Sequence, residues 1–174
     1  ILMKKIYIIY FISFLIILFL SYFTRKPERI NTIEDKNIPV SPCDGTVMYI
    51  NNNEISIFLS VFDVHLQYVP INSVIKNIEN IHGKHNMAYK PSSEHNEGVK
   101  VIFNSELGDI HVTQRVGFIA RRIYNNIKLG DKVNQTDPYG IILLGSRVDI
   151  VLPDNLECIL KKGDRVIGGV TPLI

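Results

Sequence analysis

The step from Gly145 to Ser146, within residues 143–149 (LLGSRVD), has the clearest chemical potential in this sequence. A serine hydroxyl that attacks the preceding carbonyl converts the amide into an ester. β-Elimination then leaves the serine as a pyruvoyl group, an electrophilic ketone at a new N-terminus. Glycine leaves the carbonyl open to attack and tolerates a strained backbone. The dipeptide is equally typical of ordinary turns and strand edges, so the rest of the chain must decide between the two interpretations.

Three further polar clusters have residue types suited to chemistry. Residues 41–45 (SPCDG) place Asp44 ahead of an apolar run, although an Asp-Gly pair is also a strong turn signal. Residues 58–67 (FLSVFDVHLQ) place His65 after a run of aromatic and β-branched residues, where a lone histidine is more often structural than catalytic. Residues 92–98 (SSEHNEG) form a polar stretch whose simplest interpretation is a solvated loop.

The N-terminal part of the chain predicts a membrane anchor. Residues 6–23 are apolar or aromatic except for two serines, and lysines and arginines flank them on both sides. Eighteen such residues make about 27 Å of helix, which is close to the thickness of a bilayer core. A cleaved signal peptide is disfavoured because no small-x-small site follows. We therefore expect an anchor at 1–23, a polar linker at 24–39 and one domain at 40–174, located at a membrane. Because both flanks are basic, the side that carries the domain stays open.

The domain itself reads as short β-type runs separated by turns, which predicts a mainly β fold, a single β-sandwich or barrel-like domain. A short helix is expected at 117–125 and a long loop or flap at 76–97. Strands are expected at 46–50, 55–61, 99–103, 109–112, 141–144 and 147–152.

A weak internal repeat links residues 127–133 (IKLGDKV) with residues 160–166 (LKKGDRV). Each copy is expected to form a strand, a Gly-Asp turn and a return strand, although hairpins of this kind are common. Paired hairpins are typical of lipoyl- and biotinyl-type domains. A carrier function would need an exposed lysine in a setting such as Met-Lys-Met, which the sequence lacks, so the repeat favours related halves over a carrier.

Charge and cysteine content disfavour several other classes of protein. The net charge is +2 and the basic residues are scattered, so we expect no nucleic-acid partner. Cys43 and Cys158 lack C-x-x-C partners, which argues against zinc and leaves a single disulfide open. His82 and His85 have the spacing of a ligand pair but no third ligand in pattern nearby, so no metal is expected.

Taken together, the polar clusters resemble the phosphatidylserine decarboxylase family in its short form. The likeness rests on residues 62–65 (FDVH), 117–123 (GFIARRI) and 144–149 (LGSRVD), which follow one another in the family's order. It covers roughly residues 39–153. The resemblance implies a proenzyme that cuts itself between Gly145 and Ser146. The resulting β chain (to 145) and α chain (146–174) are then expected to stay associated, with a pyruvoyl group derived from Ser146 as the covalent cofactor.

The resemblance also implies the chemistry. The amine of phosphatidylserine would form a Schiff base with the pyruvoyl carbonyl, lose carbon dioxide and be released as phosphatidylethanolamine. His65 is implied as the proton donor or as the group that positions the carboxylate, and Asp44 as an activator of Ser146. Longer members carry a second histidine where Tyr68 stands here. The base for self-cleavage is therefore left open between His65 and water.

Three arginines, Arg115, Arg121 and Arg122, are predicted to bind the lipid phosphate, with a solvated helix face as the alternative. The expected partners are a membrane phospholipid and the bilayer, which the anchor brings close to the domain. A homo-oligomer is left open. Two other functions also stay open: a non-cleaving, non-enzymatic membrane-anchored domain of the same fold, and a decarboxylase of a related phosphoserine lipid.

Overall fold

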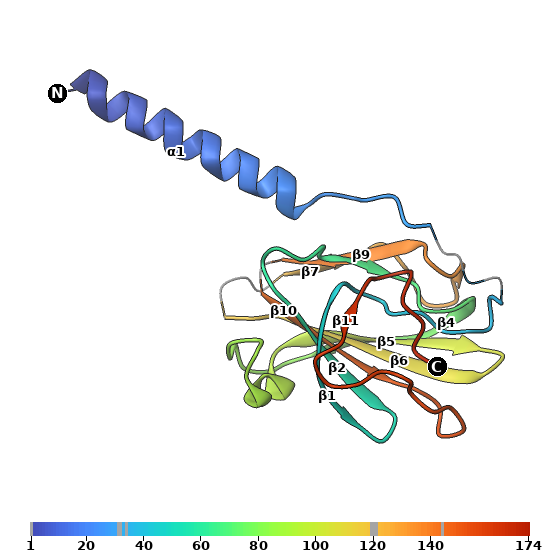
Figure 1. Cartoon of the computed structure of the whole chain (residues 1–174). Coiled ribbons are helices and arrows are strands. Elements are labelled where there is room, and N and C mark those ends of the chain that lie inside the picture. Colours follow the sequence, from blue (N-terminus) through green and yellow to red (C-terminus); the bar gives the residue numbers. More distant parts are fainter. Residues whose placement is uncertain (1, 31–32, 34, 119–121, 144) are drawn as a thin grey trace.

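The computed structural model describes residues 2–30, 33, 35–118, 122–143 and 145–174. The chain begins with helix α1 (Leu2–Phe23), whose apolar side chains are exposed along most of its length. Its stretch Met3–Phe23 is long and apolar enough to cross a bilayer by length and composition. Figure 1 shows α1 projecting away from the β domain, to which an extended segment joins it. The helix is compatible with the predicted anchor, and its place in a membrane stays a prediction.

The domain consists of antiparallel strands and one 3₁₀ turn, η1 (Pro91–His95). The strands are β1 (Gly45–Asn51), β2 (Glu54–Leu59), β3 (Leu66–Tyr68), β4 (Ser73–Ile81), β5 (Gly98–Ser105), β6 (Gly108–Arg115), β7 (Ile123–Asn125), β8 (Lys132–Val133), β9 (Pro138–Ile142), β10 (Ser146–Val151) and β11 (Arg165–Val166). In the described part of the chain they form an eight-stranded sheet, β11-β1-β2-β10-β6-β5-β4-β8, and a three-stranded sheet, β3-β9-β7. Figure 1 shows β7 and β9 layered over the larger sheet. The prediction of a mainly β, sandwich-like fold is confirmed.

Strand β10 lies in the middle of the larger sheet and is buried on both faces. It pairs with β2 on one side and β6 on the other. Because side chains alternate along a strand, Val148 and Ile150 join the hydrophobic core, whereas Arg147 and Asp149 are buried on the opposite face. The strand that begins at Ser146 is therefore held from all sides.

Two predictions of local structure were wrong. Residues 76–97 were expected to be a loop, but β4 occupies their first part and pairs with β5. The strand escaped notice because most of its side chains are at least partly exposed and polar, with a register shift between Ile75 and Asn77 that breaks the alternation. Residues 117–125 were expected to be a helix. Their described part is not helical, and β7 there pairs with β9, which supplies the backbone hydrogen bonds that a helix would otherwise make.

The internal repeat corresponds to two similar structural halves. In each half the Gly-Asp turn exchanges two backbone hydrogen bonds of 2.8–2.9 Å with one apolar strand residue, Gly130 and Asp131 with Ile75, and Gly163 and Asp164 with Val47. The return strands β8 and β11 lie at the two edges of the larger sheet. The first arm of each predicted hairpin is not a strand, because it has no partner strand in the sheets.

Candidate active site

Gly145 and Ser146 join the loop after β9 to the start of β10. The backbone of Gly145 has φ +69°, in the left-handed region that favours glycine, and among the described residues no atom beyond its chain neighbours lies within 4 Å of where a Cβ would stand. Ser146 is fully buried, and its hydroxyl has no hydrogen-bond partner among the described residues. Buried hydroxyls are normally paired because desolvation without a partner is costly. An unpaired one beside an open glycine fits a hydroxyl that is kept for reaction.

His65 lies between β2 and β3 and is also fully buried. Its Nδ1 lies 2.9 Å from the carbonyl oxygen of Asp63, and since a carbonyl only accepts, Nδ1 must carry the proton. Burial lowers the pKa of His65, which keeps the imidazole neutral near pH 7. Nε2 is then the basic nitrogen, and it has no partner in the described part of the chain. The ring is therefore arranged as a base.

The backbone of His65 is attached to the segment that leads to Ser146. Its carbonyl accepts a hydrogen bond of 3.2 Å from the amide of Ile142, the last residue of β9. The neighbouring Leu66 pairs with Ile141 in the same ladder. No hydrogen bond joins the side chains of His65 and Ser146 among the described residues. The two residues are linked through the backbone of the connection between β9 and β10.

Asp44 lies just before β1, at the same end of the central strands as Gly145. Thr46 of β1 and Arg147 of β10 both pair with Phe58 of β2, so Asp44 and Gly145 lie just beyond aligned strand positions on either side of β2. Two strand spacings amount to about 10 Å, so the Asp44 carboxylate does not touch the serine. It accepts hydrogen bonds from the guanidinium of Arg29 (2.7 and 2.8 Å) and from the amide of Gly168 (2.8 Å).

The three predicted phosphate-binding arginines differ in their surroundings. Arg115 is bound to Asp149 (2.7 Å) and to the carbonyl of Asn96 (3.1 Å). Arg122 is exposed, donates to the hydroxyl of Tyr124 (3.2 Å) and borders a cavity of about 350 Å³. Arg121 lies outside the described residues. Their role in binding phosphate stays a prediction, and Arg122 is better placed for it than Arg115.

The family model described as phosphatidylserine decarboxylase matches residues 16–173. The chain belongs to the phosphatidylserine decarboxylase family. The family prediction is confirmed, and with it the prediction that the chain is an enzyme of this decarboxylase type.

Relatives of the chain carry two kinds of name. A protein of Methanosarcina barkeri named "Putative archaetidylserine decarboxylase proenzyme" is 38% identical over 161 residues, which is 92% of this chain and 79% of the relative. Proteins named "Phosphatidylserine decarboxylase proenzyme" come from Streptomyces avermitilis (37% identical, 86% of this chain, 71% of the relative) and Chlorobium chlorochromatii (38%, 89%, 78%).

The decarboxylase domain contains a buried polar network that the sequence did not reveal as such. Arg147, fully buried, binds Asp149 (2.6 Å) and the hydroxyls of Tyr49 and Ser93. Asp149 also accepts from Ser56 (2.6 Å), in addition to Arg115. The signal was the alternation of charged and apolar residues in a strand that is buried on both faces. The network fixes the strand whose first residue is Ser146.

An apolar cavity of about 310 Å³ borders Gly145. It opens beside Gly145 and is bordered by Phe58, Val61, Met87, Ala88, Tyr89 and Phe118. Phe118 belongs to the residues 117–123 that carry the family resemblance, whereas the 76–97 segment contributes Met87, Ala88 and Tyr89. Part of the segment that was expected to be a flap thus does border the candidate site.

Proposed function

We propose that this chain is a proenzyme that cuts itself between Gly145 and Ser146 and then decarboxylates phosphatidylserine at a membrane surface. The observation that carries the proposal is a pair of buried polar atoms without partners among the described residues, the Ser146 hydroxyl oxygen and the His65 Nε2. Both belong to the segments that meet at the connection between β9 and β10.

Self-cleavage follows from these two groups. Nε2 of His65 takes the hydroxyl proton as the Ser146 oxygen attacks the Gly145 carbonyl. The C–N bond breaks as the ester forms, and the proton passes to the new amine. Removal of the Ser146 α-proton then expels the Gly145 carboxylate and leaves a dehydroalanine, which one water hydrolyses to the pyruvoyl group with release of ammonia. Every atom comes from the chain or from water.

Asp44 supports this step through its charge. Its carboxylate acts to raise the pKa of His65, opposing the larger effect of burial, and so favours the imidazolium that forms when Nε2 takes a proton. Because about 10 Å separates the two flanking strands, we assign this effect to the electric field of the carboxylate rather than to contact with Ser146.

The residues around the cut fit a pyruvoyl group at Ser146. The buried, unpartnered hydroxyl and the open space at Gly145 leave room for a ketone at the start of β10. That group supplies an electron sink for the pair left on the substrate's α-carbon when carbon dioxide departs. The apolar cavity beside Gly145 disfavours the charged carboxylate relative to neutral carbon dioxide. His65, held by the Asp63 carbonyl, takes a proton at Nε2 from the ammonium group of the substrate and delivers that proton to the α-carbon after carbon dioxide leaves.

The lipid is held at its phosphate by the exposed Arg122, and α1 keeps the domain at the bilayer. A second candidate substrate is archaetidylserine, because the names of several relatives specify it. Both lipids share the phosphoserine headgroup on which the chemistry acts.

The test is the intact mass of the purified protein beside a Ser146→Ala variant. We expect two chains from the wild type, with residues 146–174 blocked at the N-terminus by a pyruvoyl group, and one uncut chain from Ser146→Ala. A folded wild-type protein that stays uncut overturns the proposal in favour of a non-cleaving domain. Conversion of the serine headgroup into an ethanolamine headgroup, measured on phosphatidylserine and archaetidylserine in mixed micelles, then identifies the substrate.

A further inference from the structure

The end of the membrane helix contacts the candidate site directly. Phe23, the last residue of α1, is only 1% exposed, although the side chains before it are exposed. Its ring lies against the imidazole of His65, with 4.2 Å between the ring centroids. Tyr22 next to it donates from its hydroxyl to the carbonyl of Phe62 (3.2 Å) in the loop before His65.

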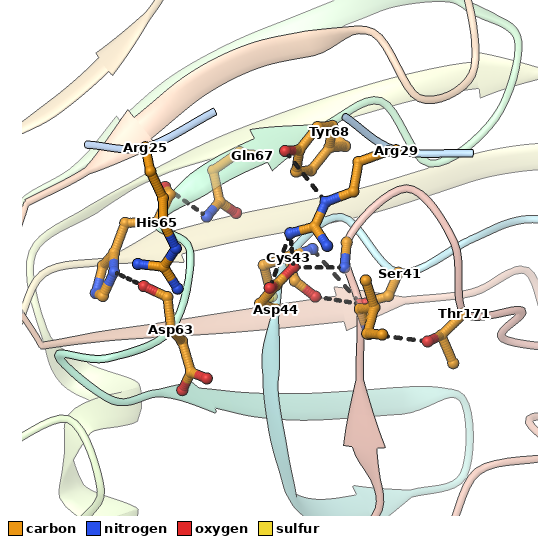
Figure 2. A network of polar contacts seen from close by, with 12 residues as sticks. Arg25, Arg29, Ser41, Cys43, Asp44, Asp63, His65, Gln67, Tyr68 and Thr171 are labelled. Carbon is orange, nitrogen blue, oxygen red and sulfur yellow. Dashed lines mark hydrogen bonds and ion pairs between the residues drawn. The ribbon is translucent and has the colours of Figure 1, made fainter. Parts of the chain in front are cut away.

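The linker continues these contacts across the site. Arg25 donates to the same Phe62 carbonyl (2.8 Å). Arg29 places its Nη2 on both oxygens of Asp44 and directs its Nε at the hydroxyl of Tyr68 (3.4 Å). Figure 2 shows Arg25 beside His65 and Asp63, and Arg29 between Tyr68 and Asp44. Arg25 therefore lies beside His65 and Arg29 beside Asp44, so the linker contacts the surroundings of both polar residues.

Exposure alternates along this segment in the way expected of an extended chain lying on a surface. Phe23, Arg25 and Arg29 face the domain, whereas Lys26 and Glu28 between them are exposed. The Arg29–Asp44 pair is shielded, with each side chain 14% exposed. A flexible tether would need neither a buried aromatic ring nor a shielded ion pair.

We propose that the residues of segment 22–29, the docking segment, that face the domain are a working part of the site, in which Phe23 positions His65 and Arg29 positions Asp44. The inference rests on the proposed function. In the docked state Phe23 excludes water from one face of the imidazole, and Arg29 holds the Asp44 carboxylate in one orientation at the sheet edge. Side-chain contacts therefore connect the membrane anchor to the reacting groups, in addition to the backbone. The site is complete only when the end of the helix is docked on it.

Arg29 is tested by the rate of self-cleavage of the full chain in detergent micelles. We expect Arg29→Ala to cut at least about tenfold more slowly, because a displaced carboxylate lowers the effectiveness of the group that it assists. Arg29→Lys, which keeps the charge, should recover part of the rate. Lys26→Ala, which removes an exposed cation of the same segment, is the matched control and should stay within about twofold of wild type.

Phe23 is tested by the dependence of the same rate on pH. Phe23→Ala exposes the imidazole, which faces Asp63, Arg25 and Asp44, and should move the acid limb of the profile to higher pH, since burial lowers the pKa of His65. A purely structural contact would change the rate without moving this limb.

The outcomes distinguish the proposed function from the role of the docking segment. A wild-type protein that stays uncut overturns the proposed function and this inference with it. Normal wild-type cleavage together with wild-type rates for Arg29→Ala overturns the inference alone. If Arg29→Ala does not fold, the Phe23→Ala profile decides, and an acid limb at the wild-type position counts against the docking segment.

Discussion

Among the residues that the structure describes, six side chains keep a buried nitrogen or oxygen atom without a hydrogen-bond partner, and two of them, Ser146 and His65, belong to the candidate site. An unsatisfied buried group costs about 1–3 kcal/mol. For Ser146 the lost partner leaves the hydroxyl free to turn toward the Gly145 carbonyl. For His65 the hydrogen bond from Nδ1 to Asp63 fixes which nitrogen is the base. The candidate site is therefore less stable than it could be at the two atoms that are proposed to react.

The lowered pKa of His65 predicts the pH dependence of self-cleavage. Neutral imidazole is the active form, so the rate should be level above about pH 6.5 and should fall as the pH drops through the lowered pKa. His65→Gln should remove this limb and slow the cut by about 10²–10⁴-fold. Time courses of precursor loss across pH 4.5–8.5, a range of about four units, measure both effects. A limb centred above the ordinary histidine value contradicts the assignment of His65 as a buried base.

Among the elements, comparison of the two halves of the domain separates the structural role of the Asp44 side chain from the role of its charge. Residues 40–47 (VSPCDGTV) and 68–75 (YVPINSVI) hold equivalent places relative to the two Gly-Asp turns. Asp44 accepts the amide of Gly168, and in the other half Asn72 accepts the amide of Gln135, each at 2.8 Å. A neutral amide thus suffices to hold this turn. The equivalent residue in the second half, Asn72, has no charge.

This comparison predicts the effect of two isosteric changes. Asp44→Asn keeps the acceptor for Gly168 and should leave the free energy of unfolding within about 1 kcal/mol of wild type, since the pair with Arg29 is only partly buried. It should nevertheless slow self-cleavage at least about tenfold, because the charge that favours the His65 imidazolium is gone. Asn72→Asp is the matched control and should cut at the wild-type rate. Rates by gel and unfolding by urea, both in detergent, check the pair, and a normal rate for Asp44→Asn would assign Asp44 to the turn alone.

The strands also show how much of the fold can be predicted from the sequence. Strands with clear alternation were predicted within a few residues, because this signal is local. The Gly145–Ser146 step and His65 also stood out by local signals, and their roles stay predictions. Strand β4 was missed because its polar, largely exposed side chains hide the pairing with β5. The contacts of Phe23 and Arg29 could not be predicted, since an apolar helix end and a linker cation carry no sign of the loops that they meet in space.

For the whole molecule, the proposed cut falls where it least disturbs the architecture. Ser146 begins β10, so cleavage severs a connection and no strand. The α chain would keep β10 between β2 and β6, and β11 against β1. Two ion pairs would also join the chains, Asp149 with Arg115 and Arg165 with Asp63. Only the loop before β10 gains freedom, because it then ends in the new C-terminus at Gly145, whereas the new N-terminus at Ser146 stays at the start of β10.

We therefore predict that the two chains stay together after cleavage and separate only in denaturant. Asp149→Ala should lower the free energy that holds them by about 3–5 kcal/mol, because it leaves Arg147 buried without its charge partner. Val151→Ala, at the exposed end of the same strand, should cost less than about 1 kcal/mol. The urea concentration at which the α chain leaves the β chain, followed by size exclusion in detergent, measures both. Loss of the α chain from wild type without denaturant contradicts the central place of β10, and equal midpoints for the two variants contradict the weight given to Asp149.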